Sequence, residues 1–105
     1  MRTKPGEIYL VDLGLGGKVR PMLVVSRDDA DPPRALALCV PVTTAFRGSR
    51  YEVPLPKVAF LRQMSYANTQ GLMAIEHHEL SRLLGRLPSA ALLSVKDGLR
   101  YALDL

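Results

Sequence analysis

Short apolar runs, broken repeatedly by glycine and proline, constrain the fold of this 105-residue chain more than any other feature. Residues 6–12 alternate polar and apolar side chains, as a half-buried strand does. Similar runs follow at 21–26, 35–42 and 51–55, with further candidates at 64–67 and 72–75. We therefore predict five or six short strands with tight antiparallel connections, which argues against a Rossmann arrangement.

The spacing of apolar residues becomes helical near the C-terminus. Residues 76–84 carry leucines at helical spacing, and a longer stripe follows at Leu92, Val95, Leu99, Ala102 and Leu103. We expect two C-terminal helices, the first ended by Gly85 and the second capped by Ser89. The predicted fold class is thus mainly β with C-terminal helices (α+β), a strongly bent sheet or small barrel with a helix packed on it.

Length and composition indicate a single domain over residues 1–105. The chain is 48% hydrophobic and 23% charged, and no apolar stretch is long enough to span a bilayer, so we expect a cytoplasmic protein that does not bind membranes. Its one cysteine, Cys39, lies in an apolar run, which favours a buried hydrophobic role over a nucleophilic one.

The distribution of charge suggests a polyanionic partner. The formal net charge is +4, and residues 44–67 hold Arg47, Arg50, Lys57 and Arg62 against one anion, Glu52. Three aspartates within 28–31 form a separate acidic turn, which we interpret as a solvated loop because prolines follow and no glycine sets a calcium-loop geometry.

A glycine turn with two cations, Gly17-Lys18-Val19-Arg20-Pro21, precedes the second apolar run. Glycine lets the backbone approach closely, so Arg20 can reach an anionic ligand such as a phosphate. The same residues also fit an ordinary turn with solvated charges. At the end of the third run, Pro41 limits strand pairing, so we expect the hydroxyls of Thr43 and Thr44 at an edge or mouth.

Motifs for common chemistries are missing from the sequence. There is no HExxH, CxxC, Walker loop, GxGxxG or GxSxG pattern. The remaining tools are Arg, Thr, Ser and amides, which suit cleavage of RNA by its own 2′-hydroxyl, because the substrate then supplies the nucleophile. Arginine stays protonated at neutral pH. We therefore favour electrostatic stabilisation of the phosphorane and proton donation to the leaving oxygen over a role for arginine as a proton shuttle.

Five segments, in order and spacing, together with the final amphipathic stretch, resemble the MazF/PemK toxins of type II toxin-antitoxin modules. They are GEIYLVDL at 6–13, RP before LVVS at 20–26, VPVTT at 40–44, YEVPL at 51–55 and LGRL at 84–87. The resemblance covers nearly the whole chain. It implies an SH3-like barrel of the MazF/PemK/CcdB type and a homodimer. It further implies an endoribonuclease, or mRNA interferase, held inactive by a cognate antitoxin.

The resemblance also implies a reaction and a site. Single-stranded RNA or mRNA would be cleaved at short sequences without metal or cofactor, leaving 2′,3′-cyclic phosphate and 5′-hydroxyl ends. Arg20 matches the family's catalytic arginine and Thr43 its catalytic threonine or serine, with Thr44 as the alternative. The residues expected to bind RNA are Lys18, Thr44, Arg47, Arg50, Tyr51, Asn68 and Gln70.

Two departures from the family pattern stand out. The turn before Arg20 is shorter than in most members, which suggests an altered or looser sequence preference. Where many members have Gln-Ile-Arg, this chain has Gly71-Leu72-Met73, although Asn68 and Gln70 stand close enough to replace some contacts. Two alternatives stay open. One is a non-catalytic barrel that binds RNA or inhibits a protein such as DNA gyrase, as CcdB toxins do; the other is a structural barrel without a ligand.

Overall fold

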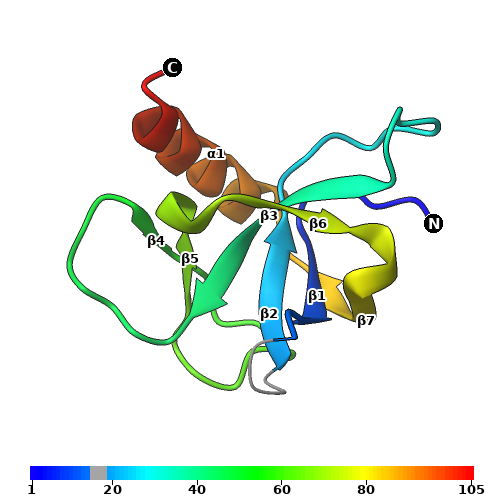
Figure 1. The fold of residues 1–105 in the computed structure, drawn as a ribbon. Helices are drawn as coiled ribbons and strands as arrows, with labels where there is room; N and C mark the ends of the chain where they lie inside the picture. Colours follow the sequence, from blue (N-terminus) through cyan, green and yellow to red (C-terminus); the bar gives the residue numbers. More distant parts are fainter. Residues whose placement is uncertain (15–18) are drawn as a thin grey trace.

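The computed structural model describes residues 1–14 and 19–105, so Gly17 and Lys18 of the predicted phosphate turn lie outside the described residues. Strands account for most of the regular secondary structure that is described (Figure 1). The strands are β1 (Glu7–Asp12), β2 (Val19–Val24), β3 (Leu36–Thr43), β4 (Glu52–Pro54), β5 (Tyr66–Asn68), β6 (Met73–Glu76) and β7 (Leu80–Arg86). Two 3₁₀ turns, η1 (Thr69–Gly71) and η2 (His77–Glu79), precede β6 and β7, and α1 (Ser89–Leu103) ends the chain.

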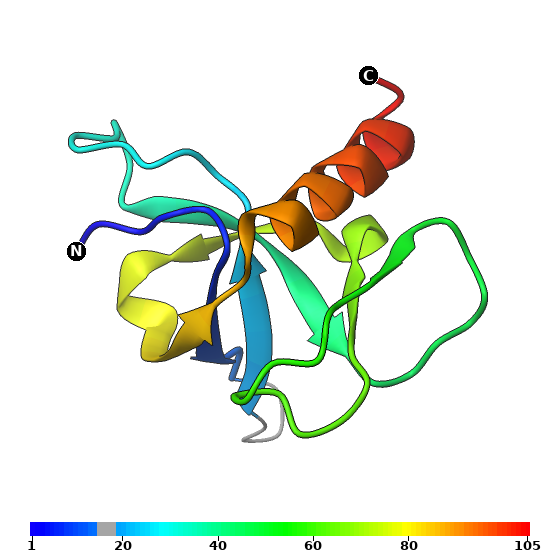
Figure 2. The ribbon, with the colours of Figure 1, turned by 180° about the vertical axis from the view of Figure 1, so that it is seen from behind.

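All strand pairs are antiparallel, in the order β4-β5-β3-β2-β1-β7. The first half of β3 also pairs with β6, whereas its last residues pair with β5. Within the described residues the path ends at β4 and β7, so the bent sheet is not closed into a full barrel. Helix α1 crosses one side of this sheet, as both views show (Figures 1 and 2).

The central strands are buried on both faces. On one face Ile8, Leu23 and Val40 pack with Leu87, which precedes α1, and with Val95 of α1. On the other face, buried side chains of β1, β2 and β3 pack with Ile75 and Leu80, at the ends of β6 and β7. Burial on both faces explains why 21–26 and 35–42 read as nearly continuous apolar runs.

One of the two predicted helices is wrong. Most of 76–84 is extended, because β7 pairs with β1 and only η2 is helical. Register shifts along the β1–β7 pair break strict alternation, which left leucines at a spacing that resembles a helix. Gly85 does not end a helix. It lies in the strand, where an added Cβ would stand 2.4 Å from the Phe60 ring.

The second predicted helix is confirmed as α1, with its start shifted by one residue. Pro88 is the residue before the helix, and Ser89 is its first residue rather than its cap. Val95 and Gly98 are buried, whereas Leu103 of the predicted stripe is half exposed. No helix among the described residues is both long and apolar enough to cross a membrane.

Cys39 is fully buried, as predicted. Burial raises the pKa of its thiol to about 12, so it stays protonated at neutral pH and is a poor nucleophile. The acidic turn is an exposed loop in which Asp28 pairs with Arg2.

Candidate functional site

A cleft of about 800 Å³ opens at the end of the sheet where β2 begins and β3 ends. Side chains from β2, β3, the β3–β4 loop, β5 and η1 form its walls. Seven of the nine predicted site residues line it: Arg20, Thr43, Thr44, Arg47, Tyr51, Asn68 and Gln70. Residues far apart in the sequence therefore meet in one open site.

The antiparallel pairing of β2 and β3 brings Arg20 and Thr43 to the same end of the sheet. The strands pair with Met22 opposite Pro41 and Val24 opposite Cys39. Arg20 and Thr43 each lie two residues beyond the Met22–Pro41 pair on their strands, and both line the cleft. Thr43 Oγ1 accepts a hydrogen bond from the Ala45 N–H at 3.0 Å, so its own hydroxyl proton is available to a ligand.

The charge balance of the cleft is basic. Arg20 and Arg47 are both exposed, and neither forms an ion pair with any other described residue. Among the lining residues that the structure describes, the one acidic side chain is Glu52, which is buried and points its carboxylate toward loop N–H groups. Two free guanidinium groups and a threonine hydroxyl make a suitable surface for a phosphate.

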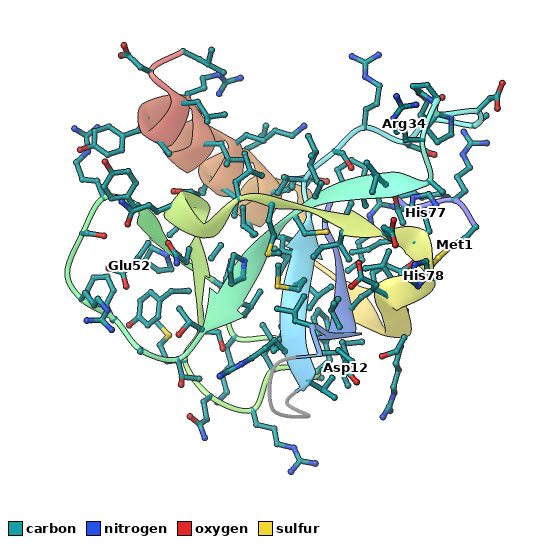
Figure 3. The ribbon with its side chains drawn as sticks, in the orientation of Figure 1. Met1, Asp12, Arg34, Glu52, His77 and His78 are labelled. Carbon is teal, nitrogen blue, oxygen red and sulfur yellow. The ribbon has the colours of Figure 1, made fainter. Side chains whose placement is uncertain are left out.

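Glu52 organises the loop between β3 and β4, where Figure 3 shows it beside that loop. Its carboxylate accepts hydrogen bonds from the Arg47 N–H at 3.0 and 3.1 Å and from the Ser49 N–H at 3.1 Å. The Ser49 hydroxyl donates to it as well, at 2.8 Å. These donors, first that of Arg47, lower the pKa of Glu52.

Sequence reasoning counted Glu52 only as the one anion of a basic segment. The available signal was the spacing of Ser49 and Glu52, three residues apart, at which a carboxylate reaches back to N–H groups of a turn.

The opposite wall is held by η1. Asn68 Oδ1 caps this turn by accepting from the Gln70 N–H at 3.1 Å. The buried Thr69 between them ties the wall to Tyr51, since its N–H and its hydroxyl both donate to the Tyr51 carbonyl, at 2.9 and 2.7 Å. Asn68 also lies opposite Glu52 in the β4–β5 pair, so the two walls share one framework.

Two predicted residues are not in the cleft lining that the structure describes. The Arg50 guanidinium lies over the Tyr101 ring of α1, 4.0 Å from its centroid, which is a cation–π contact. Tyr51 also packs on Tyr101, with centroids 5.3 Å apart, while still lining the cleft. Lys18 lies outside the described residues.

The fold and site thus define a small bent-sheet protein whose basic cleft suits an extended polyanion.

Comparison with known proteins assigns the chain to a family. Residues 4–103 match the PemK-like, MazF-like toxins of type II toxin-antitoxin systems. The chain belongs to this family.

Its relatives include two curated proteins of Mycobacterium tuberculosis. It is 32% identical over 100 residues to the probable endoribonuclease MazF5, covering 94% of this chain and 91% of that one. It is 30% identical over 88 residues to the endoribonuclease MazF3, covering 84% and 85%. Among solved structures, a mycobacterial endoribonuclease in complex with its cognate antitoxin superimposes with a TM-score of 0.87 at 26% identity, over 98% of this chain and 96% of that one.

Proposed function

We propose that this toxin-family chain is an endoribonuclease that cleaves single-stranded RNA in the cleft between β2 and β3. The observation that carries the proposal is the meeting of Arg20 and Thr43 at one end of the sheet, in a basic cleft large enough for a nucleotide. The endoribonuclease names of the curated relatives support it.

The reaction needs no groups beyond the cleft, the substrate and solvent water. The ribose 2′-hydroxyl loses its proton to water as its oxygen attacks the adjacent phosphorus, and the bond from phosphorus to the 5′-oxygen breaks. The 5′-oxygen takes up a proton from water, so the ends are a 2′,3′-cyclic phosphate and a 5′-hydroxyl. Arg20 stabilises the negative charge that develops on the phosphorane and donates a hydrogen bond to the departing 5′-oxygen. Thr43 donates its hydroxyl to a non-bridging oxygen, with Thr44 as the alternative donor.

The rest of the cleft binds the strand. Arg47 contacts a neighbouring phosphate, and the amides of Asn68 and Gln70 reach base edges, where sequence can be read. Tyr51 supplies an aromatic face. We assign Lys18 and Arg50 to phosphates farther along the strand, Arg50 from its place over Tyr101.

We further propose a cytoplasmic homodimer controlled by a cognate antitoxin that occupies the same cleft. The mycobacterial structure that contains a cognate antitoxin supports this partner. An acidic or flexible antitoxin segment would compete with RNA for Arg20 and Arg47, because both ligands need the same exposed cations.

The test is cleavage of a long single-stranded RNA in the presence of EDTA, with sequencing of 5′-hydroxyl ends. Arg20→Ala should lower the cleavage rate by about 10²- to 10³-fold or more while the protein stays folded, since it removes a donor to the developing charge. Arg34→Ala is the matched control, because Arg34 is also an exposed arginine, lies in the loop between β2 and β3, and does not line the cleft.

Full cleavage by Arg20→Ala would remove Arg20 from the mechanism. Binding of RNA by the wild type without any cleavage would contradict the enzyme and favour the non-catalytic binding barrel.

A further inference from the structure

An exposed aromatic stack stands at the rim of the cleft. Phe46 packs its ring on that of Tyr66, with centroids 4.5 Å apart and ring planes 12° from parallel. Phe46 is nevertheless 52% exposed. Because the rings are nearly parallel, Tyr66 covers one face of Phe46 and leaves the outer face uncovered by this partner.

The stack is anchored next to the proposed reaction centre from both sides. Tyr66 lies directly opposite Thr43 in the β3–β5 pair. Phe46 stands in the chain between Ala45 and Arg47, and both of these line the cleft. The hydrogen bonds of the Arg47 N–H to Glu52 fix the backbone immediately after Phe46. The outer ring face is therefore held in a set position rather than carried on a free loop.

We propose that the Phe46–Tyr66 stack is a platform for one nucleobase of the bound single-stranded RNA, next to the scissile phosphate. This inference rests on the proposed function. Nucleic acid is the occupant that the surroundings favour, because an exposed flat aromatic face beside free guanidinium groups matches the alternation of base and phosphate along a single strand.

The platform would contribute affinity more than sequence choice. Every base has a π face, so a ring that offers no hydrogen-bonding group of its own accepts any of the four. The polar side chains that can distinguish bases, Asn68 and Gln70, lie on another wall of the cleft. We therefore expect a preference at this subsite that follows stacking area, with purines bound more tightly than pyrimidines.

Binding is measured with an RNA oligonucleotide that spans a mapped cleavage site and carries a 2′-O-methyl group only at the attacking ribose, which blocks cleavage. Phe46→Leu keeps an apolar side chain but removes the ring, and should weaken binding by roughly 5- to 140-fold, the effect of losing one base–aromatic stack. Phe46→Tyr retains a ring and should restore binding.

An abasic scan identifies the base that the platform holds. In the wild type, one abasic position should cost about the same affinity as Phe46→Leu. In Phe46→Leu the same abasic position should cost little more, because the two changes remove one contact. Additive losses at every position would overturn the platform.

A spectroscopic test is independent of affinity. The chain has no tryptophan and four tyrosines, so Phe46→Trp introduces a lone tryptophan that can be excited selectively, and a stacked base should quench its emission. Leu93→Trp is the control, since Leu93 is 60% exposed on α1 and does not line the cleft.

The outcomes separate this inference from the proposed function. A wild type that neither binds nor cleaves RNA overturns the proposed function. A folded Phe46→Leu that binds and cleaves RNA as the wild type does overturns the platform alone. The same holds if Phe46→Leu weakens only the binding of an antitoxin peptide and leaves RNA binding unchanged.

Discussion

Helix α1 lies close to the framework of the cleft at Gly98, and an added methyl group there should destabilise the protein. A Cβ at Gly98 would stand 2.6 Å from Val53 Cγ2 and 3.2 Å from Thr69 Cγ2. Unstrained carbon atoms are separated by about 3.5–4.0 Å. Val53 adjoins Glu52 and Thr69 adjoins Asn68, so the contact bears on both walls of the cleft.

Two opposing effects decide whether Gly98→Ala raises or lowers the free energy of unfolding. Alanine is better than glycine inside a helix by about 1 kcal/mol. Overpacking of a filled site costs about 1–3 kcal/mol, and Val53 is buried and branched at Cβ, so it yields little. The net loss in free energy of unfolding is therefore about 0–2 kcal/mol, which lowers the melting temperature by about 4–8 °C for each kcal/mol.

Thermal and urea unfolding measure the loss, at one fixed protomer concentration because association would change the apparent stability. A double-mutant cycle with Val53→Ala isolates the contact. In that background the Val53 methyl groups are gone, so Gly98→Ala should become neutral or stabilising. A Gly98→Ala protein more stable than the wild type, or equally destabilised in both backgrounds, would refute the reasoning.

Two further predictions concern buried acidic groups. Glu52→Gln should raise KM for RNA and lower stability at neutral pH. Because the pKa of Glu52 is lowered in the native protein, the carboxylate stabilises the fold above its ordinary pKa of 4.5, and this stabilisation is lost as the pH falls below that value. The difference between wild type and variant in urea unfolding should therefore shrink in acid, and a difference independent of pH would contradict this role. Cys39, with its pKa raised to about 12, should react with a thiol reagent at neutral pH far more slowly in the native protein than in urea, and equal rates would contradict its burial.

The placement of the proposed site residues was easier to predict than one part of the fold. Arg20 and Thr43 could be placed together from the sequence, because consecutive antiparallel strands bring the start of one beside the end of the next. The strand β7 could not be predicted from the sequence, because its pairing partner β1 lies more than sixty residues earlier and register shifts hid the alternation of polar and apolar residues in β7. Local spacing therefore favoured a helix that the long-range pairing overrides.

Arg50 and Glu52 show a second limit of sequence reasoning. Arg50 was predicted from its charge and its place just after the Thr43 strand, but its position depends on Tyr101, which only the docking of α1 brings near. Glu52 was noticed as a charge, whereas its role lies in the N–H groups that it gathers. In both cases the deciding contact involves geometry that residue type does not encode.

The contact of Tyr101 with Arg50 and Tyr51 has a practical consequence for work with this protein. Tyr101 is in the last turn of α1, so an affinity tag, fluorescent fusion or truncation at the C-terminus acts close to the loop that forms one wall of the cleft. The N-terminus lies on the other side of the molecule in Figure 1. Fusions for toxicity or binding assays are therefore better placed at the N-terminus, and results from C-terminal fusions should be compared with the untagged chain.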